Sequence, residues 1–489
     1  MPAILALIGG SLLLFALGNG TQQSAFITAA FALGACAGVF HFSLLVMDRH
    51  RYWSISALLG AATLASYCGT GALSLLFLHS YSGIVANIYH KLTPLQLTQA
   101  GLYILLFYAA MCLSGRLERR SWKPILKATE NENLKPGPYL VFAVILTMSQ
   151  LRFMLSGEWS YGGLMLSDAD QLPVDVALVM QLGLPSAGVL GWILGKKCSW
   201  PTTLLCLAIL AIGLLWHLGI GRRAIILQLM LVSVGFLWAR YHVVQPRRML
   251  VFGAVAVFLA LSLSMLFYSM RLDAIRGDGG DGGLLQRVES AFSDLSSDAG
   301  SVAQAQKDDV AVRSFMLVGH LANLMEGTGI DSATGGLLAF YHAVLVVPRL
   351  LLPTKMELLP AAGVSEAWTN PRFDVPVIDQ PDSIIASSYI DFLWAGLFIY
   401  PMFILGIAVG MVWVLNLVGN NWARIYLLFA IFITFADVEQ PLFGYFTNLR
   451  NMLVIAGLAI IVRLCLGRPL QAPSGASGGP GVRPAPERW

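Results

Sequence analysis

The chain has 489 residues, of which 57% are hydrophobic and only 12% are charged, and its formal net charge is +4. Soluble proteins carry about 25% charged residues, so this composition excludes an ordinary soluble protein, a disordered chain and a collagen. It predicts an all-α polytopic membrane protein, in which runs of about 20 apolar residues cross the bilayer as helices.

Apolar runs of this length predict about twelve transmembrane helices, nine within residues 1–269 and three within residues 396–466. The first run has neither a preceding Lys or Arg nor a small-residue cleavage site, which predicts a retained helix rather than a signal peptide. Residues 467–489 are rich in Pro, Gly, Ala and Ser and are predicted to form a disordered cytoplasmic tail. The predicted helices are residues 2–18, 24–46, 54–79, 98–115, 138–156, 175–195, 202–219, 224–239, 250–269, 396–417, 422–436 and 450–466.

Basic residues are distributed unequally between the two sides of these helices. With a cytoplasmic N-terminus, loops and termini on that side carry 18 of the 31 Lys and Arg residues. The opposite side carries five outside its long loop, namely Lys91, Arg152, Arg222, Arg223 and Arg450. The positive-inside rule therefore predicts that both termini are cytoplasmic.

One segment between predicted helices, residues 270–395, is long enough to form a domain, and this orientation makes it a long periplasmic loop. It holds 8 basic and 16 acidic residues, so nucleic acid is not an expected partner. The glycine-rich run 277–283 is interpreted as a flexible linker. Apolar residues at helical spacing in 284–295 and 312–324 predict amphipathic helices on the membrane surface. The apolar run 335–352 is expected to be re-entrant or packed against the bundle, because a further span would weaken the charge rule.

Several ionisable residues are predicted to lie together at the outer membrane surface. Such groups cost about 2.5 to 3.5 kcal/mol at membrane depth, so they are candidates for function. Arginine binds phosphate well, because its planar guanidinium donates two parallel hydrogen bonds. The convergence of several arginines on one face favours a lipid pyrophosphate as substrate. The alternative is that these arginines reach lipid headgroups or pair with Asp437 and Glu439. The set is Arg152, Arg222, Arg223, Asp437, Glu439 and Arg450.

No metal or other cofactor is expected. The six cysteines lack metal-ligand spacing, and no DxD pair that could hold a metal and a nucleotide-sugar is evident in a predicted cytoplasmic loop. These loops are also too short for a nucleotide-binding domain, so a lipid-linked donor already carried across the membrane fits better.

Two short motifs lie in the second half of the long loop. Residues 347–355 read VPRLLLPTK, a P-R-x-x-x-P-x-K pattern, and residues 383–396 read SIIASSYIDFLWAG. Together they resemble the O-antigen polymerase (Wzy-type) family of oligosaccharide repeat-unit polymerases, in which an S…Y-x-[DN]-F-x-x-x-G helix start follows a long periplasmic loop. The Gly-Arg-Arg turn at 221–223 is also similar to a basic turn of that family. The chain departs from the pattern at Leu351, where an aromatic residue is common, and at Glu357, where a further Pro is common.

This resemblance implies a metal-independent glycosyltransferase of the bacterial inner membrane. Such an enzyme moves a growing glycan from undecaprenyl pyrophosphate onto an incoming lipid-linked repeat unit at the periplasmic face, in the biosynthesis of lipopolysaccharide O-antigen, capsule or exopolysaccharide. Its expected partners are the undecaprenyl-pyrophosphate-linked oligosaccharide, membrane lipids, and a chain-length regulator and a flippase of the same pathway.

Candidate site residues follow from this chemistry. Pyrophosphate binding is expected from Arg152, Arg222, Arg223, Arg313, Arg349, Lys355 and Arg450. The base that takes the acceptor hydroxyl proton is expected among Asp391, Glu366, His320 and His342. Structural roles remain as alternatives, since both histidines lie on apolar stretches, Asp391 could cap the tenth helix, and Arg349 and Lys355 could anchor at the interface.

Two other functions remain open. An O-antigen ligase, which transfers a finished glycan to the lipid A core, would show similar helices and a similar loop. A polysaccharide or lipid-linked oligosaccharide transporter would show internal symmetry and interrupted helices with polar groups near the midplane. The polar groups here gather on one face and no repeat is evident, which favours a transferase.

Overall fold

The computed structural model describes most of the chain as helices. The described residues are 2–76, 92–130, 137–156, 174–196, 198–220, 222–241, 243–276, 289, 293, 300, 304, 317–326, 330–348, 351–360, 366–374, 383–418 and 421–465. They contain no β-strand. Eight helical segments among them are long and apolar enough to cross a membrane, as expected for an all-α polytopic membrane protein.

Each of the twelve predicted apolar segments corresponds to a helix, which confirms the secondary structure expected from hydropathy. These helices are α1 (Pro2–Thr21), α2 (Ser24–Met47), α4 (Ile55–Leu76), α6 (Pro94–Glu130), α7 (Gly137–Ser156), α8 (Val174–Gly195), α9 (Trp200–Ile220), α10 (Arg222–Arg240), α11 (Pro246–Arg276), α17 (Gly396–Leu417), α18 (Asn421–Ala436) and α19 (Leu442–Cys465).

Shorter helices join and cover the long ones. They are α3 (Arg49–Tyr52), η3 (Ile330–Ser332), α14 (Leu337–Val346), η4 (Lys355–Leu358), α15 (Glu366–Thr369), η5 (Asn370–Phe373), α16 (Ile384–Phe392) and η6 (Leu393–Ala395). Residues 317–326 form a further helical segment.

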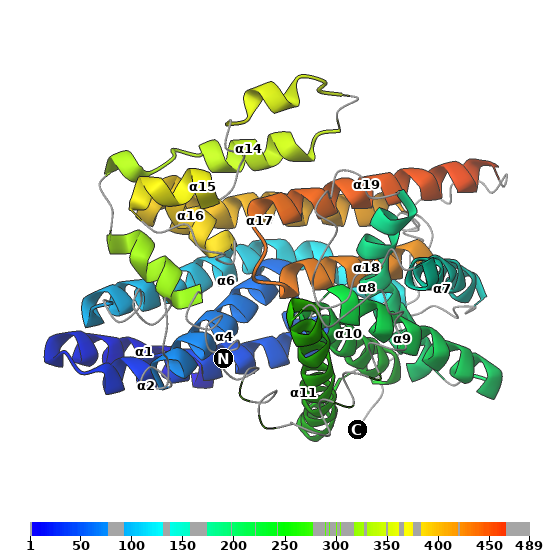
Figure 1. The fold of residues 1–489 in the computed structure, drawn as a ribbon, viewed down its shortest axis with the longest axis horizontal. Coiled ribbons are helices and arrows are strands. Elements are labelled where there is room, and N and C mark those ends of the chain that lie inside the picture. The colour runs from blue at the N-terminus through cyan, green and yellow to red at the C-terminus, as the bar shows by residue number, and fades with distance from the viewer. Residues whose placement is uncertain are drawn as a thin grey trace, which may run out of the picture.

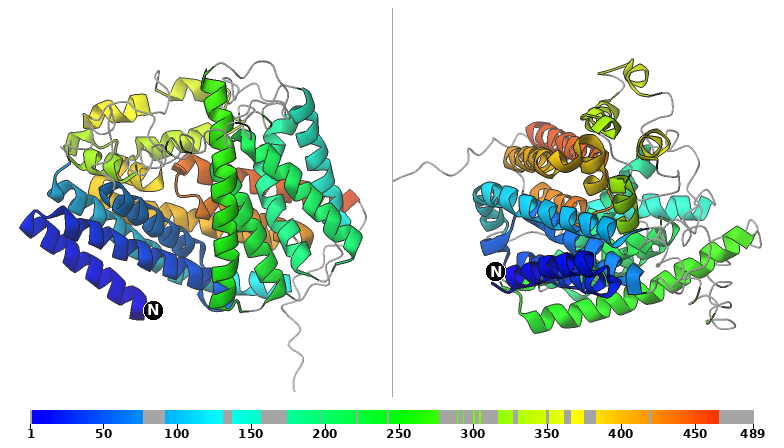
Figure 2. Two further views of the ribbon diagram at one scale, coloured as in Figure 1. Left: turned by 60° about the horizontal axis from the view of Figure 1, so that its bottom comes forward. Right: turned by 90° about the vertical axis from the view of Figure 1, so that its left-hand side faces the viewer.

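The long helices form one bundle (Figure 1). Helix α2 packs against α1 and α4, α4 against α6, and α6 against α17. On the other side α8 packs against α10 and α18, while α11 lies on the outside and crosses its neighbours steeply (Figure 2). An aromatic cluster of Trp53, Trp238 and Phe432 lies between these groups, with ring centroids 5.0 to 6.0 Å apart.

Glycines allow two of the helix pairs to approach closely. A Cβ on Gly38 of α2 would lie 2.4 Å from the Ala65 nitrogen of α4. A Cβ on Gly235 of α10 would lie 2.2 Å from the Gly188 carbonyl oxygen of α8. Small residues are common at such contacts in membrane bundles, because van der Waals packing drives helix association there.

Three details differ from the sequence-based expectation. Helix α6 extends to Glu130, so residues 116–130 are helical rather than a loop. Arg450 lies two turns inside α19 instead of at its start. Residues 317–325 are almost entirely buried, so they do not form an amphipathic surface helix. The predicted tail, the glycine-rich run and most of 284–295 lie outside the described residues.

A carboxylate from α6 holds the start of α4. Glu118 is 1% exposed, and its Oε1 accepts hydrogen bonds from the Ser56 backbone nitrogen at 2.8 Å and the Ser54 hydroxyl at 2.7 Å. Its Oε2 accepts from the Ser56 hydroxyl at 3.0 Å. The first turn of a helix has backbone N–H groups without intrahelical partners and a partial positive charge, so a buried carboxylate is stabilised there.

Replacing this carboxylate should therefore destabilise the bundle. We expect Glu118→Ala to lower the free energy of unfolding by about 2 to 4 kcal/mol, because several buried donors lose their acceptor. Thermal unfolding in detergent measures the effect. Arg120→Ala, an exposed position on the same helix, is the control. Equal melting temperatures for the two variants would contradict the assigned role of Glu118.

Candidate functional site

The second motif forms a buried helix at the centre of the candidate site. All residues from Ile384 to Asp391 in α16 are buried. Ser383 caps this helix by accepting a hydrogen bond from the Ala386 nitrogen, and its hydroxyl is also bonded to Tyr67 of α4. The Ser388 hydroxyl lies 2.8 Å from the Tyr103 hydroxyl of α6. The motif therefore ties the end of the long loop to two long helices.

The motif glycine allows the chain to fold back after α16. Leu393 has a positive φ of 51°, and α17 begins three residues later. A Cβ on Gly396 would lie 2.1 Å from the Ser388 carbonyl oxygen. Only glycine leaves room for this contact between the two helices.

Asp391 holds the start of α14. It is fully buried, and its Oδ1 accepts hydrogen bonds from the Leu338 nitrogen at 3.0 Å and from the Thr334 hydroxyl. Its Oδ2 accepts from the Ala339 nitrogen at 2.9 Å and the Tyr400 hydroxyl at 2.7 Å. Asp391 therefore caps α14, whereas the capping alternative considered from sequence placed it at the tenth helix, which is α17. Four donors surround the carboxylate, an arrangement that fixes α14 in place.

Two cationic side chains hold the other end of α14. Lys355 Nζ donates hydrogen bonds to the carbonyl oxygens of Leu345 and Val347, each at 3.0 Å. Arg450 of α19 donates to the Val346 carbonyl oxygen at 3.1 Å. Cations are stabilised at a helix C-terminus, where carbonyl groups lack intrahelical partners. Asp391, Lys355 and Arg450 therefore all form hydrogen bonds with one short helix, α14, although none of them is part of it.

Helix α14, which forms part of the run 335–352, packs alongside α19 and α16, one of the two arrangements expected for that run. Figure 1 shows α14 and α19 lying roughly parallel. His342 of α14 is 5% exposed, and its ring centroid lies 6.4 Å from that of Phe443. Its Nδ1 is buried without a hydrogen-bond partner. This histidine lies between the two ends that are held by charged residues.

His320 lies in the helical segment 317–326, and its Nδ1 is also buried without a partner. Burial lowers the pKa of both His320 and His342 to about 4, because an apolar environment disfavours the charged imidazolium. Both rings are therefore neutral at pH 7.

The structure describes the other predicted site residues only in part. The backbones of Arg222 and Arg223 begin α10, and Glu366 begins α15, but their side chains lie outside the described part of the chain. The guanidinium of Arg152, near the end of α7, lies 5.3 Å from the Phe153 ring centroid. Arg313 and Arg349 lie outside the described residues.

The end of α10 meets the first turns of α18, where Trp238 and Tyr241 line one pocket with Ile425. The two helices pack together at this point, where both Phe429 and Phe432 of α18 contact the Trp238 ring. Asp437 follows α18 directly.

A second polar cluster lies among α7, α8, α9 and α10. His217 Nδ1 is bonded to Gln228 Oε1, and Gln228 Nε2 donates to the Leu210 carbonyl oxygen at 3.0 Å. A cavity of about 20 Å³ is lined by this pair together with Gln150 and Thr147. The local sequence does not indicate this pair, because His217 and Gln228 lie on different helices.

Sequence reasoning also missed Tyr67, Tyr103, Thr334 and Tyr400. A tyrosine within an apolar span signals a buried hydrogen bond, because its hydroxyl needs a partner there. The sequence could not give the partners, which lie 316 residues away for Tyr67 and 285 for Tyr103.

Within the described residues, no group of three His, Cys, Asp or Glu side chains is arranged to hold a metal ion. Comparisons of the chain with models of known families, with curated proteins and with solved structures found no match.

Loss of the Asp391 carboxylate should release the start of α14. We expect Asp391→Ala to cost about 2 to 4 kcal/mol and to increase hydrogen exchange at the Leu338 and Ala339 amides. Asp391→Asn should have a smaller effect, since it keeps one acceptor oxygen. Exchange followed by mass spectrometry measures both variants, with the exposed Asp374→Ala as control. Unchanged protection in Asp391→Ala would mean that α14 is held by other contacts.

Acid should destabilise the fold through His320 and His342, two of the four histidines that are buried among the described residues. An unfolded histidine has a pKa of about 6.5, so below this pH the unfolded chain binds more protons than the folded chain. The stabilisation is complete above pH 6.5 and falls as the pH drops towards 4. At pH 5 the loss should be about 2 kcal/mol for each histidine. The measurement is the melting temperature in detergent at pH 7 and pH 5, and the His320→Gln/His342→Gln double variant should lose less on acidification. A drop as large as in the unchanged chain would contradict this assignment.

Proposed function

We propose that this chain is a membrane glycosyltransferase that polymerises undecaprenyl-pyrophosphate-linked repeat units at the periplasmic face. One observation carries the proposal. The two motifs that resemble the O-antigen polymerase family act on the same helix, since Asp391 of the second motif holds one end of α14 and Lys355 of the first motif holds the other. Residues of the two motifs thus contact the same helix, which supports the proposal.

The proposed topology has twelve spans, with both termini in the cytoplasm of a bacterium and residues 270–395 as a periplasmic loop. The excess of Lys and Arg on one side supports this orientation. In this topology α14, the turn after α18 and the start of α10 all lie towards the periplasmic face of the inner membrane.

The proposed reaction needs no metal or cofactor bound to the enzyme. The acceptor hydroxyl oxygen forms a bond to the anomeric carbon of the donor, and the bond from that carbon to the diphosphate breaks. Negative charge then develops on the departing diphosphate, which fixed cations stabilise. Lys355 and Arg450 each retain N–H donors beyond those that bond to α14. Arg152, Arg222, Arg223, Arg313 and Arg349 are the further cations proposed for this site.

His342 is the base that the geometry favours for the acceptor hydroxyl. It lies on the helix that Asp391 and Lys355 hold, about 8 Å along the axis from the start of α14. Its Nδ1 has no hydrogen-bond partner within the described residues, so this nitrogen can accept the hydroxyl proton as the new bond forms. Asp391 then acts as a positioning residue, because its oxygens are occupied by donors from α14 and Tyr400.

The purified protein, reconstituted without added metal and supplied with a lipid-pyrophosphate oligosaccharide that matches the native repeat unit, tests this proposal. We expect a ladder of glycan lengths on a gel. His342→Asn should lower the rate at least about 100-fold, the usual effect of losing a general base. Arg372→Gln, an exposed position in the same loop, should retain the ladder.

Other outcomes separate the alternatives. Transfer to added lipid A core without a ladder would identify a ligase. Movement of the lipid-linked unit across the bilayer without transfer would identify a transporter. A normal ladder in His342→Asn would keep the polymerase proposal but remove the assigned base.

A further inference from the structure

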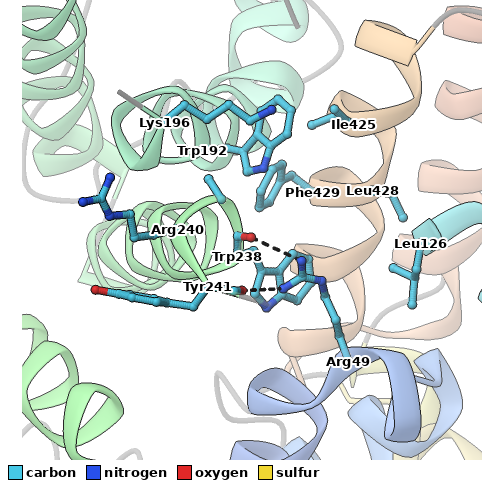
Figure 3. Close-up of a pocket in the computed structure, with 11 residues that line it drawn as sticks. Arg49, Leu126, Trp192, Lys196, Trp238, Arg240, Tyr241, Ile425, Leu428 and Phe429 are labelled. Atoms are coloured by element: carbon cyan, nitrogen blue, oxygen red, sulfur yellow. Dashed lines mark hydrogen bonds between the residues drawn. The ribbon is translucent and has the colours of Figure 1, made fainter. Parts of the chain in front are cut away.

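A pocket lies at the opposite end of the bundle from α14. It has a volume of about 90 Å³ and is formed where α2, α8 and α10 end and α18 begins. Figure 3 shows Arg49 reaching the end of α10 from the side opposite to Arg240. Because these helices end here, the pocket lies at the level where a membrane gives way to water.

The lining of this pocket is strongly basic. It includes Arg49, Lys196 and Arg240 and no carboxylate. Arg49 is 6% exposed, and it donates hydrogen bonds to the carbonyl oxygens of Trp238 at 3.2 Å and Tyr241 at 3.4 Å. A cation with so little contact with water gains more from a nearby anion than an exposed cation does.

The other walls are apolar or aromatic. Lys196 Nζ lies 4.2 Å from the centroid of the Trp192 ring, and Phe429 packs within 6.0 Å of the Trp238 ring (Figure 3). Leu126 and Leu428 complete this side. A soluble anion would make no contact with these apolar walls, whereas a phospholipid presents a phosphate and an acyl chain together.

We propose that this pocket binds the phosphate headgroup of an anionic phospholipid, with its acyl chain against the apolar walls. Lys196 and Arg240 contact the phosphate, and Arg49 both caps α10 and adds its charge. Basic pockets between transmembrane helices recognise anionic headgroups in this way. The site is separate from the one proposed for glycan transfer, and it does not depend on the orientation of the chain, because recognition rests on the charges and walls of the pocket itself.

The test uses the full chain in detergent, with thermal stability and native mass spectrometry as readouts. Phosphatidylglycerol is titrated and compared with phosphatidylcholine and with inorganic phosphate. We expect phosphatidylglycerol to raise the melting temperature and to remain bound, whereas the other two do neither. Lys196→Gln/Arg240→Gln should weaken the binding roughly 30-fold, because each basic residue contributes to headgroup attraction.

A matched control removes the same charge outside the pocket. Arg116→Gln/Arg120→Gln changes two exposed residues of α6, the helix whose Leu126 lines the pocket, and should bind as the unchanged chain does. Equal weakening in both double variants would overturn the proposal in favour of general surface charge. Saturation by inorganic phosphate alone would overturn it in favour of a soluble anion.

Discussion

The backbone N–H and C=O groups at the ends of helices have no partners within the helix, and in an apolar bundle they must find hydrogen bonds elsewhere. In this chain, charged side chains from other elements provide several of these hydrogen bonds. Glu118 holds the start of α4 and Asp391 the start of α14. Lys355 and Arg450 hold the end of α14, and Arg49 holds the end of α10. The charge of each side chain is opposite to the partial charge of the helix end that it contacts. The short helix α14 depends most on this constraint, because ten residues form few hydrogen bonds of their own.

This constraint changes how the ionisable residues are interpreted. Their cost at membrane depth marks them as candidates for function, yet several stabilise neighbouring backbone. The two roles are compatible for cations, since Lys355 and Arg450 keep donors for an anionic ligand while they hold α14. They conflict for Asp391, whose oxygens would have to leave α14 to accept a proton. The proposed chemistry therefore relies on His342, and Asp391 positions the helix that carries it.

Hydropathy predicted the long helices well, because the bilayer sets their length and every span must satisfy its own backbone. The same reasoning placed the start of α19 too late. The eight residues 442–449 include both polar and apolar side chains, and the helix begins with them, before the apolar run. Motifs indicated Asp391 and Lys355 but not their shared contact with α14, which depends on tertiary packing. The role of Glu118 was missed because charge counting assigned its neighbourhood to a loop, whereas the structure makes it helical. Partners such as Tyr103 and Ser388 are far apart in sequence, so no local pattern reveals them.

The most direct test of the central claim is a double-mutant cycle across the two ends of α14. The variants are Asp391→Ala, Lys355→Met and their combination, and the quantity measured is the free energy of unfolding in detergent. If these residues hold one cooperative helix, either change releases it, and the double variant should lose little more than the worse single variant. Losses that add to within about 0.5 kcal/mol would contradict the account, because they would show that the two ends are held independently.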